Sequence, residues 1–360
     1  MNISVILPYA NPHVLDWVLQ LKNIGISLNI GCVKSTQDFR PGYFQEYDDI
    51  SDIKYFYKSK GCRRDFERNL NKSDILISLG IFDKELVLLR RFCKSNVRLL
   101  ILSEPFNPIN SKRELFLRKA WSLLLRQLYH NINFYCIGGS DVKKYYYDDL
   151  LFRKSVYYNF GYFPQVRFTD PIYKMKGETL IIGYLGQLIY RKGVDKLLIL
   201  IDQLKNRPNL DFEFLIAGDG SMKKKIIDEI RGDNRFKYIG LISERTNVES
   251  FLEGIDILLV PSHFDGWGAV VNEGVAKCCA IVSNYNVYAY RFISGLLGEK
   301  SENQCDVVEV TIELINNVDK LNDLKEKMYS IHKCIDPISV AQEFAKSLNL
   351  NYKSKVFTIL

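Results

Sequence analysis

Between residues 261 and 273 the chain reads PSHFDGWGAVVNE. An apolar run over 255–260 precedes this stretch, and apolar residues at helical spacing over 269–277 continue from it. A buried strand that ends in a glycine turn and leads into a helix is the building unit of a parallel sheet covered by helices. Because the same order recurs along the chain, the sequence predicts an α/β protein.

Two halves of the chain repeat this layout. In the first half we expect strands over 3–7, 28–32, 75–78, 97–103 and 133–137, with helices such as 14–22 and 84–93. In the second half we expect strands over 180–185, 212–217, 236–239, 255–260 and 280–283, with helices over 194–205, 221–231, 247–253 and 269–277. The pattern predicts two doubly wound, Rossmann-like domains that face a central cleft.

The domain boundary is predicted near residue 165. Residues 161–179 carry Pro, Gly and charged residues without apolar periodicity, which is typical of a linker. We therefore expect an N-terminal domain over 1–164 and a second domain over 165–335. Helical spacing continues to residue 350, and the helix and tail over 336–360 are expected to cross back and pack on the first domain.

Composition narrows the class of protein. The chain has 360 residues, of which 47% are hydrophobic and 25% charged, which suits two globular domains. Its apolar runs fall short of the roughly 18–20 residues that a membrane-spanning helix needs, and the first residues lack the pattern of a secretory signal. We expect a cytoplasmic protein whose eight cysteines are reduced, because they form no C-x-x-C pair.

The net charge of +7 favours phosphorylated ligands or an anionic membrane surface. The 22 Tyr and 21 Phe could suggest base stacking, but no RNA-binding or helix-turn-helix signature accompanies them. We do not expect nucleic acid as a partner.

The stretch at 261–273 carries the first candidate site. Gly266 and Gly268 allow backbone N–H groups to approach a phosphate or a sugar hydroxyl at the start of a helix. Asp265 and Glu273 can accept hydrogen bonds from the neighbouring hydroxyls of a ribose or a sugar ring. The alternative is that these acids only complement the helix dipole, which leaves the paired glycines unexplained.

Two further glycine turns follow predicted strands. The stretch GYLGQLIYRKGV (183–194) places Arg191 and Lys192 beyond the end of a strand, where cations can stabilise a departing diphosphate; the alternative is a solvated turn. The stretch Gly218-Asp219-Gly220-Ser221 either lines a ligand or simply ends its strand, with Asp219 or Ser221 capping the next helix.

In this order, these motifs and the turn Gly240-Leu241-Ile242-Ser243 resemble the C-terminal half of glycosyltransferase family 4, the retaining enzymes of the GT-B fold. The resemblance covers roughly residues 180–285. It implies that Glu273 holds the ribose of a nucleotide sugar, Asp265 holds the transferred sugar and Lys192 stabilises the leaving diphosphate. It also implies a donor-binding set made of Gly186, Gln187, Gly218, Asp219, Gly220, Leu241, Ser243, Ser262, Gly266, Trp267, Gly268 and Glu273.

The chain departs from the family pattern at several positions. Asp265 stands where the family commonly has Glu, and Gln187 stands where it often has Arg. In the first domain, Pro8-Tyr9-Ala10-Asn11-Pro12 replaces a glycine-rich loop, and Glu104 occupies the place of a histidine that faces the acceptor. By analogy Glu104 is a candidate base or a hydrogen-bond partner of the acceptor, besides the catalytic candidates Lys192, Arg191 and Asp265; the alternative is a glutamate that is merely exposed to solvent at the end of its strand.

The resemblance predicts a retaining, metal-independent hexosyltransferase that moves a sugar from a UDP- or GDP-linked donor to a saccharide, as in bacterial surface polysaccharide synthesis. No cofactor or metal is expected, because the cations supply the charge and the four histidines have no metal-site spacing. Two alternatives stay open. One is another GT-B enzyme, such as a nucleotide-sugar epimerase, and the other is a degenerate protein that binds nucleotide sugar without transfer.

One segment of the first domain combines apolar and basic residues. Residues 112–126 read KRELFLRKAWSLLLR, which suits either a helix lying on an anionic bilayer or a core helix with one charged side. A second basic cluster would suit an acceptor carried on a lipid diphosphate at the inner face of the cell membrane; it consists of Lys54, Lys58, Lys60, Arg63, Arg64 and Arg68.

Overall fold

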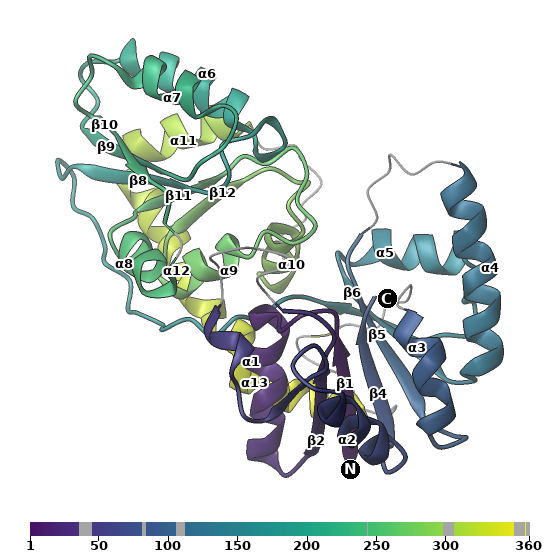
Figure 1. Cartoon of the computed structure of the whole chain (residues 1–360). Helices are drawn as coiled ribbons and strands as arrows, with labels where there is room; N and C mark the ends of the chain where they lie inside the picture. The colour runs from purple at the N-terminus through teal and green to yellow at the C-terminus, as the bar shows by residue number, and fades with distance from the viewer. Residues whose placement is uncertain are drawn as a thin grey trace. The chain divides into compact units, whose positions relative to one another are not determined.

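The computed structural model describes residues 1–35, 45–80, 84–105, 112–242, 244–297, 306–348 and 357. Ser243 of the predicted donor-binding set lies outside the described residues, as do Cys305, one of the eight cysteines, and most of the predicted tail beyond residue 348. The chain divides into two compact units, each described by itself below: the first unit is Met1–Pro164 with Pro337–Leu360, and the second unit is Gln165–Asp336. Helices and parallel strands alternate in both units, which confirms the predicted α/β class (Figure 1).

The first unit contains a seven-stranded parallel sheet in the order β3-β2-β1-β4-β5-β6-β7. Its strands are β1 Asn2–Leu7, β2 Ser27–Cys32, β3 Ile53–Tyr55, β4 Ile75–Leu79, β5 Arg98–Ser103, β6 Ile132–Ile137 and β7 Tyr157–Phe160. Its helices are α1 Pro12–Gln20, α2 Lys60–Leu70, α3 Lys84–Leu89, α4 Lys112–Leu128, α5 Ser140–Lys144 and α13 Pro337–Ser347.

The central strands of this sheet are buried almost throughout, because helices cover both faces and leave no side for polar residues. The sequence prediction missed β3 and β7. The first has only three residues with Lys54 in the middle, and the second, Tyr-Tyr-Asn-Phe, is only four residues long. Both are the edge strands of the sheet, where short and partly polar strands are common.

The second unit contains a five-stranded parallel sheet in the order β10-β9-β8-β11-β12. Its strands are β8 Leu180–Leu185, β9 Phe212–Ala217, β10 Phe236–Gly240, β11 Ile257–Val260 and β12 Ala280–Ser283. Its helices are α6 Val194–Lys205, α7 Lys223–Ile230, α8 Arg245–Glu253, α9 Val270–Ala276, α10 Tyr288–Leu296, α11 Val307–Asn316 and α12 Val318–Ile335.

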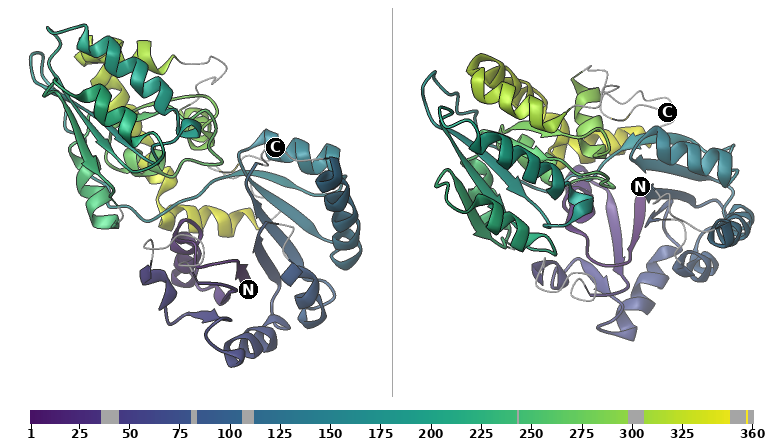
Figure 2. Two further views of the ribbon diagram at one scale, coloured as in Figure 1. Left: turned by 45° about the horizontal axis from the view of Figure 1, so that its top comes forward. Right: turned by 90° about the horizontal axis from the view of Figure 1, so that it is seen from above.

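Helices cover both faces of this sheet. Helices α6, α7 and α11 lie on one face, and α8, α9 and α12 lie on the other (Figures 1 and 2). Strand order decides which loops meet, since β8 is hydrogen-bonded to β9 on one side and to β11 on the other. The loops that leave the carboxyl ends of β8, β9 and β11 therefore share one edge of the sheet, where ligands bind in open α/β sheets.

Among the described residues we find no helix whose length and apolar character would let it span a membrane.

Candidate active site

Two loops that are distant in the sequence bring the catalytic candidates together. Lys192 ends a short 3-10 helix, Tyr190–Lys192, after β8, and its Nζ forms an ion pair with the carboxylate of Asp265 after β11. The Arg191 guanidinium lies 3.9 Å from the same carboxylate and donates a hydrogen bond of 3.1 Å to the carbonyl of Phe264. Two cations thus converge on one acid at the carboxyl edge of the sheet.

Close backbone packing holds these loops against each other. The amide of His263 donates to the Arg191 carbonyl at 2.9 Å. Gly193 adopts a φ of +76°, and a Cβ at this position would lie 2.0 Å from the carbonyl oxygen of Pro261. Only glycine fits this contact, since any side chain would push the two loops apart.

A histidine and an aspartate add a second link between the same loops. The ring Nε2 of His263 lies 2.8 Å from Oδ1 of Asp195 in the first turn of α6, and the ring of Tyr190 stacks on the imidazole at 4.7 Å. Sequence reasoning gave His263 no role and missed Asp195. An acid in the first turn of a helix is common for electrostatic reasons, so its pattern carried no signal of this pairing.

The glycine turn after β9 packs beside the turn after β8. Gly218 has a φ of +141°, and a Cβ there would lie 1.8 Å from the carbonyl oxygen of Gly186. The amide of Leu188 donates to the carbonyl of Asp219 at 2.8 Å. The turns after β8 and β9 therefore form one continuous backbone surface.

The side chain of Asp219 is exposed and pairs with Lys223 at 3.0 Å, and this hydrogen bond lowers its pKa. Neither Asp219 nor Ser221 caps α7, because the helix starts later, at Lys223, with Met222 at its N-cap position. That part of the sequence prediction is wrong.

The acidic loop after β11 contains two side chains that face the protein interior. Trp267 is 3% exposed, its indole N–H donates to Asn272 Oδ1 at 2.8 Å, and its ring packs against Phe292. Ser262 is 2% exposed, and its carbonyl accepts a hydrogen bond from Asn284 at 3.1 Å. Both residues were predicted to bind the donor, which stays a prediction; in this structure the Trp267 side chain packs within the protein and the Ser262 carbonyl helps to hold the loop.

Glu273 lies in the first turn of α9, and its carboxylate is partly buried. Burial raises its pKa from 4.5 to about 7; the positive charge of Arg245 opposes this shift and the negative charge of Glu249 adds to it. The structure shows no hydrogen bond to this carboxylate from the described residues. A partly buried acid of this kind is suited to accept hydrogen bonds from a ligand.

The remaining predicted residues occupy varied positions. Gly266 and Gly268 lie in the acidic loop beside Asp265, and Gln187 is exposed after β8. Leu241, after β10, is 56% exposed. Glu104 belongs to the first unit, where it is exposed directly after β5, and its acceptor role stays a prediction.

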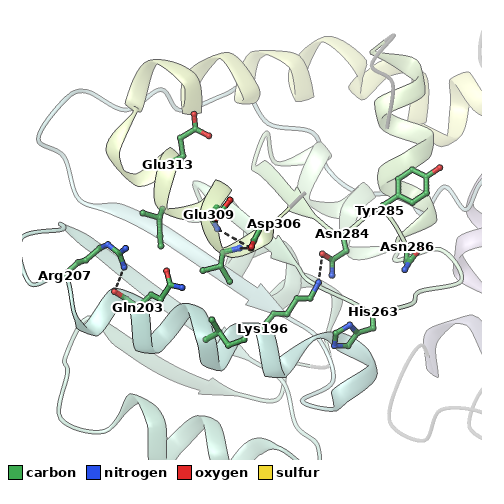
Figure 3. A pocket seen from close by; sticks show the side chains of 13 residues that line it. Lys196, Gln203, Arg207, His263, Asn284, Tyr285, Asn286, Asp306, Glu309 and Glu313 are labelled. Atoms are coloured by element: carbon green, nitrogen blue, oxygen red, sulfur yellow. Dashed lines mark hydrogen bonds between the residues drawn. The ribbon is translucent and has the colours of Figure 1, made fainter. Parts of the chain in front are cut away.

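A cavity of about 970 Å³ opens next to His263 (Figure 3). It lies between α6, α11 and the loop after β12, and Lys196 donates to Asn284 Oδ1 at 2.9 Å in its wall. Acidic side chains from α11, which include Glu309 and Glu313, line the opposite side. Sequence reasoning did not predict this cavity.

In the described part of the chain, no three His, Cys, Asp or Glu side chains gather as a metal site would require. The expectation of no metal and no cofactor stays a prediction. The described cysteines form no disulfide, and burial raises the pKa of the Cys278 thiol to about 11, which opposes a nucleophilic role.

Comparison with known proteins adds a family to this geometry. Residues 166–330, which lie in the second unit, match the model of the family described as glycosyl transferases group 1. Over 97% of the chain and 100% of its counterpart, the structure matches HepE of Anabaena in complex with UDP and glucose, with a TM-score of 0.61 and 12% identity. The chain has the GT-B fold.

Two curated relatives of this GT-B chain are named as glycosyltransferases. An uncharacterized glycosyltransferase of Methanocaldococcus jannaschii is 35% identical over 42% of this chain and 44% of its own length. The O-antigen biosynthesis glycosyltransferase WclY of Escherichia coli is 22% identical over 68% of this chain and 71% of its own length. The GT-B chain thus spans less than half the length of the archaeal relative, and its place in family 4 stays a prediction.

Proposed function

We propose that this protein is a retaining glycosyltransferase that moves a hexose from a nucleoside diphosphate sugar to a saccharide acceptor. The observation that carries the proposal is the convergence of Lys192 and Arg191 on Asp265 at the carboxyl edge of the second sheet. A departing diphosphate gathers negative charge, which two fixed cations stabilise directly. In this proposal the cations supply the charge that a metal would otherwise provide.

Donor binding then requires an exchange of partners at Lys192. The Lys192 side chain is 21% exposed, and its ammonium group forms an ion pair with Asp265. Diphosphate oxygens would take over the ammonium group, and the released Asp265 carboxylate would accept a hydrogen bond from a hydroxyl of the sugar. The exchange leaves neither charge buried without a partner, which keeps its cost low.

Glu273 is proposed to hold the nucleoside. Ribose offers two neighbouring hydroxyls, and a carboxylate can accept both hydrogen bonds. These bonds favour the ionised carboxylate, which burial disfavours in the unliganded protein. Nucleotide binding and loss of a proton are therefore coupled at this residue.

The relatives guide the proposed substrates. HepE was solved with UDP and glucose, and WclY is named for O-antigen biosynthesis. We extend these names to a UDP- or GDP-linked donor and to an acceptor in surface polysaccharide synthesis. We place the reaction in the cytoplasm, where nucleotide sugars are made.

A thermal-shift panel of UDP, GDP, ADP and CMP, each free and as nucleotide sugars, tests donor binding, because a ligand of the native state raises its melting temperature. We expect UDP or GDP compounds to stabilise the protein. Transfer to saccharide acceptors is then followed by NMR, and we expect the anomeric configuration of the donor to be kept. A shift without transfer to any acceptor would indicate a binding protein, and an inverted product would contradict the retaining mechanism.

A further inference from the structure

Helix α4 exposes a row of large apolar side chains. Phe116 is 70% exposed, Leu117 58%, Leu123 54% and Leu124 38%. We call these four residues the α4 ridge. They lie within one side of a helix that has 3.6 residues per turn, since their spacings are one, seven and eight residues. Figure 1 shows α4 at the margin of the first unit.

The opposite side of α4 already fills the core of the first unit. Leu125 is fully buried in the cluster that includes Phe134 and Tyr146, and Ser122 donates to the carbonyl of Leu150 at 3.3 Å. The helix is therefore apolar on two sides, of which only one is used in folding. Contiguous exposed apolar residues of this size mark an interaction surface.

Positive charge lies along one flank of the ridge. Lys119 is exposed between its two halves. Arg126 of the same helix donates to the carbonyl of Leu151 at 2.9 Å, and Leu151 is itself an exposed leucine. Two cations that follow closely in the sequence, Arg153 and Lys154, are both exposed. The surface thus combines leucines with cations, as an interfacial helix does.

The charge of the two units differs in sign. The first unit has 27 Lys and Arg against 17 Asp and Glu, a net charge of +10, whereas the second has 22 against 25, a net charge of −3. In the basic cluster predicted around α2, Lys58 pairs with Asp49, Arg63 with Glu67 and Glu85, and Arg68 with Asp65, so acidic residues balance part of its charge. Near α4, the exposed cations Lys119, Arg153 and Lys154 accompany exposed apolar side chains, which suits an anionic partner with an apolar interior.

We propose that the α4 ridge inserts into the surface of an anionic lipid bilayer and that the neighbouring cations bind the lipid headgroups. Apolar side chains gain free energy at the boundary of the acyl chains, and each nearby cation adds attraction to acidic headgroups. A second copy of the chain is a poorer occupant, because a twofold contact through the ridge would bring two units of +10 together. The proposal does not depend on sugar transfer.

Cosedimentation of the full chain with vesicles tests it. The vesicles contain phosphatidylcholine alone or with about 30% phosphatidylglycerol. We expect binding to the anionic vesicles, weakened when salt rises from about 0.1 M to about 0.5 M. The variant Leu123→Gln/Leu124→Gln should bind at least about tenfold more weakly. Arg153→Glu/Lys154→Glu should lose the preference for anionic lipid.

A matched control is Ile338→Gln on α13. Ile338 is 52% exposed, which is similar to the 54% of Leu123, but it lies outside the ridge. It should bind vesicles like the wild type, and all variants should keep the wild-type melting temperature and nucleotide response. Equal vesicle binding by the ridge variant and the wild type would overturn the proposal. So would a wild-type dimer in sedimentation velocity that the ridge substitutions convert to monomer, because a second copy would then cover the ridge.

Discussion

Lys192 and Asp265 form an ion pair at the candidate site, and this pair restrains the position of both side chains. Their pairing holds the ammonium group at the edge of the second sheet before any donor arrives. A cation that is placed in advance stabilises a leaving diphosphate without the cost of reorganisation during the reaction. The role of Lys192 should therefore lie mainly in turnover.

We expect Lys192→Ala to lower kcat for sugar transfer by about 10²- to 10³-fold, with a smaller change in the KM of the donor. Steady-state kinetics with the donor identified by thermal shift provides the measurement. Lys237→Ala is the control, because Lys237 forms an ion pair with Glu213 in the same unit but on β10, at 2.7 Å. An unchanged kcat in the Lys192 variant would remove this residue from the mechanism.

The raised pKa of Glu273 predicts a pH effect on stability. Between pH 4.5 and about 7 the folded protein keeps a proton on Glu273 that the unfolded chain releases, so the stability of the wild type should fall as pH rises through this window. The loss is at most about 3 kcal/mol, since the carboxylate is partly exposed. Melting curves should show that the stability of Glu273→Gln relative to the wild type is greater at pH 8 than at pH 5.

The same residue predicts how nucleotide affinity depends on pH. Because ribose hydroxyls bind the ionised carboxylate, the wild-type affinity should rise from pH 6 to pH 8, as measured by calorimetry. Glu273→Gln should weaken binding and abolish the pH dependence. Glu229→Gln on α7, whose carboxylate lies 3.9 Å from Lys205, should change neither property. A pH-independent affinity in the wild type would contradict the proposed ribose contact.

At the scale of single elements, the loop between β8 and α6 depends on one glycine. Gly193→Ala should destabilise the protein by about 2–4 kcal/mol, because the methyl group meets the Pro261 carbonyl and the φ of +76° disfavours a side chain. Thermal unfolding measures this loss. Gly177→Ala separates the two causes, since Gly177 has a φ of +93° and nothing within 4 Å of the added Cβ, so only about 1 kcal/mol is expected. Equal losses in both variants would show that loop contact is unimportant.

At the scale of the whole molecule, the C-terminal helix belongs to the first unit. Phe344 of α13 is fully buried between aromatic rings of distant elements, 4.8 Å from the ring of Trp17 in α1 and 5.1 Å from that of Tyr135 in β6. The hydroxyl groups of Tyr135 and Ser347 are 3.0 Å apart. The last helix therefore completes a core that the first residues of the chain begin.

Phe344→Ala should destabilise the first unit by about 3–5 kcal/mol through loss of packing and a cavity. Hydrogen exchange should show faster exchange in α1 and β6, while β8 and β9 keep wild-type protection. Ile338→Ala, at an exposed position of the same helix, should change protection little. Faster exchange in the second sheet as well would show that α13 supports both units.

Much of this protein follows from local sequence patterns. Apolar runs separated by helical spacings determined the α/β class, and the glycine turns around Gly193, Gly218 and Gly268 marked the loops that leave the strands. These features depend on neighbours within a few residues, so periodicity and turn chemistry identify them. The same reasoning missed β3 and β7, since three- and four-residue strands at a sheet edge are too short for periodicity.

Contacts between distant residues required the tertiary structure. The sequence marked Lys192 and Asp265 separately, but the adjacency of β8 and β11 brings them together, and it brings Asp195 to His263. The burial of Trp267 and the raised pKa of Glu273 depend on packing from several elements. The unused apolar side of α4 became visible only once the other side was seen in the core. Burial and pairing are properties of the folded chain, because they depend on strand order and on which helix faces are covered.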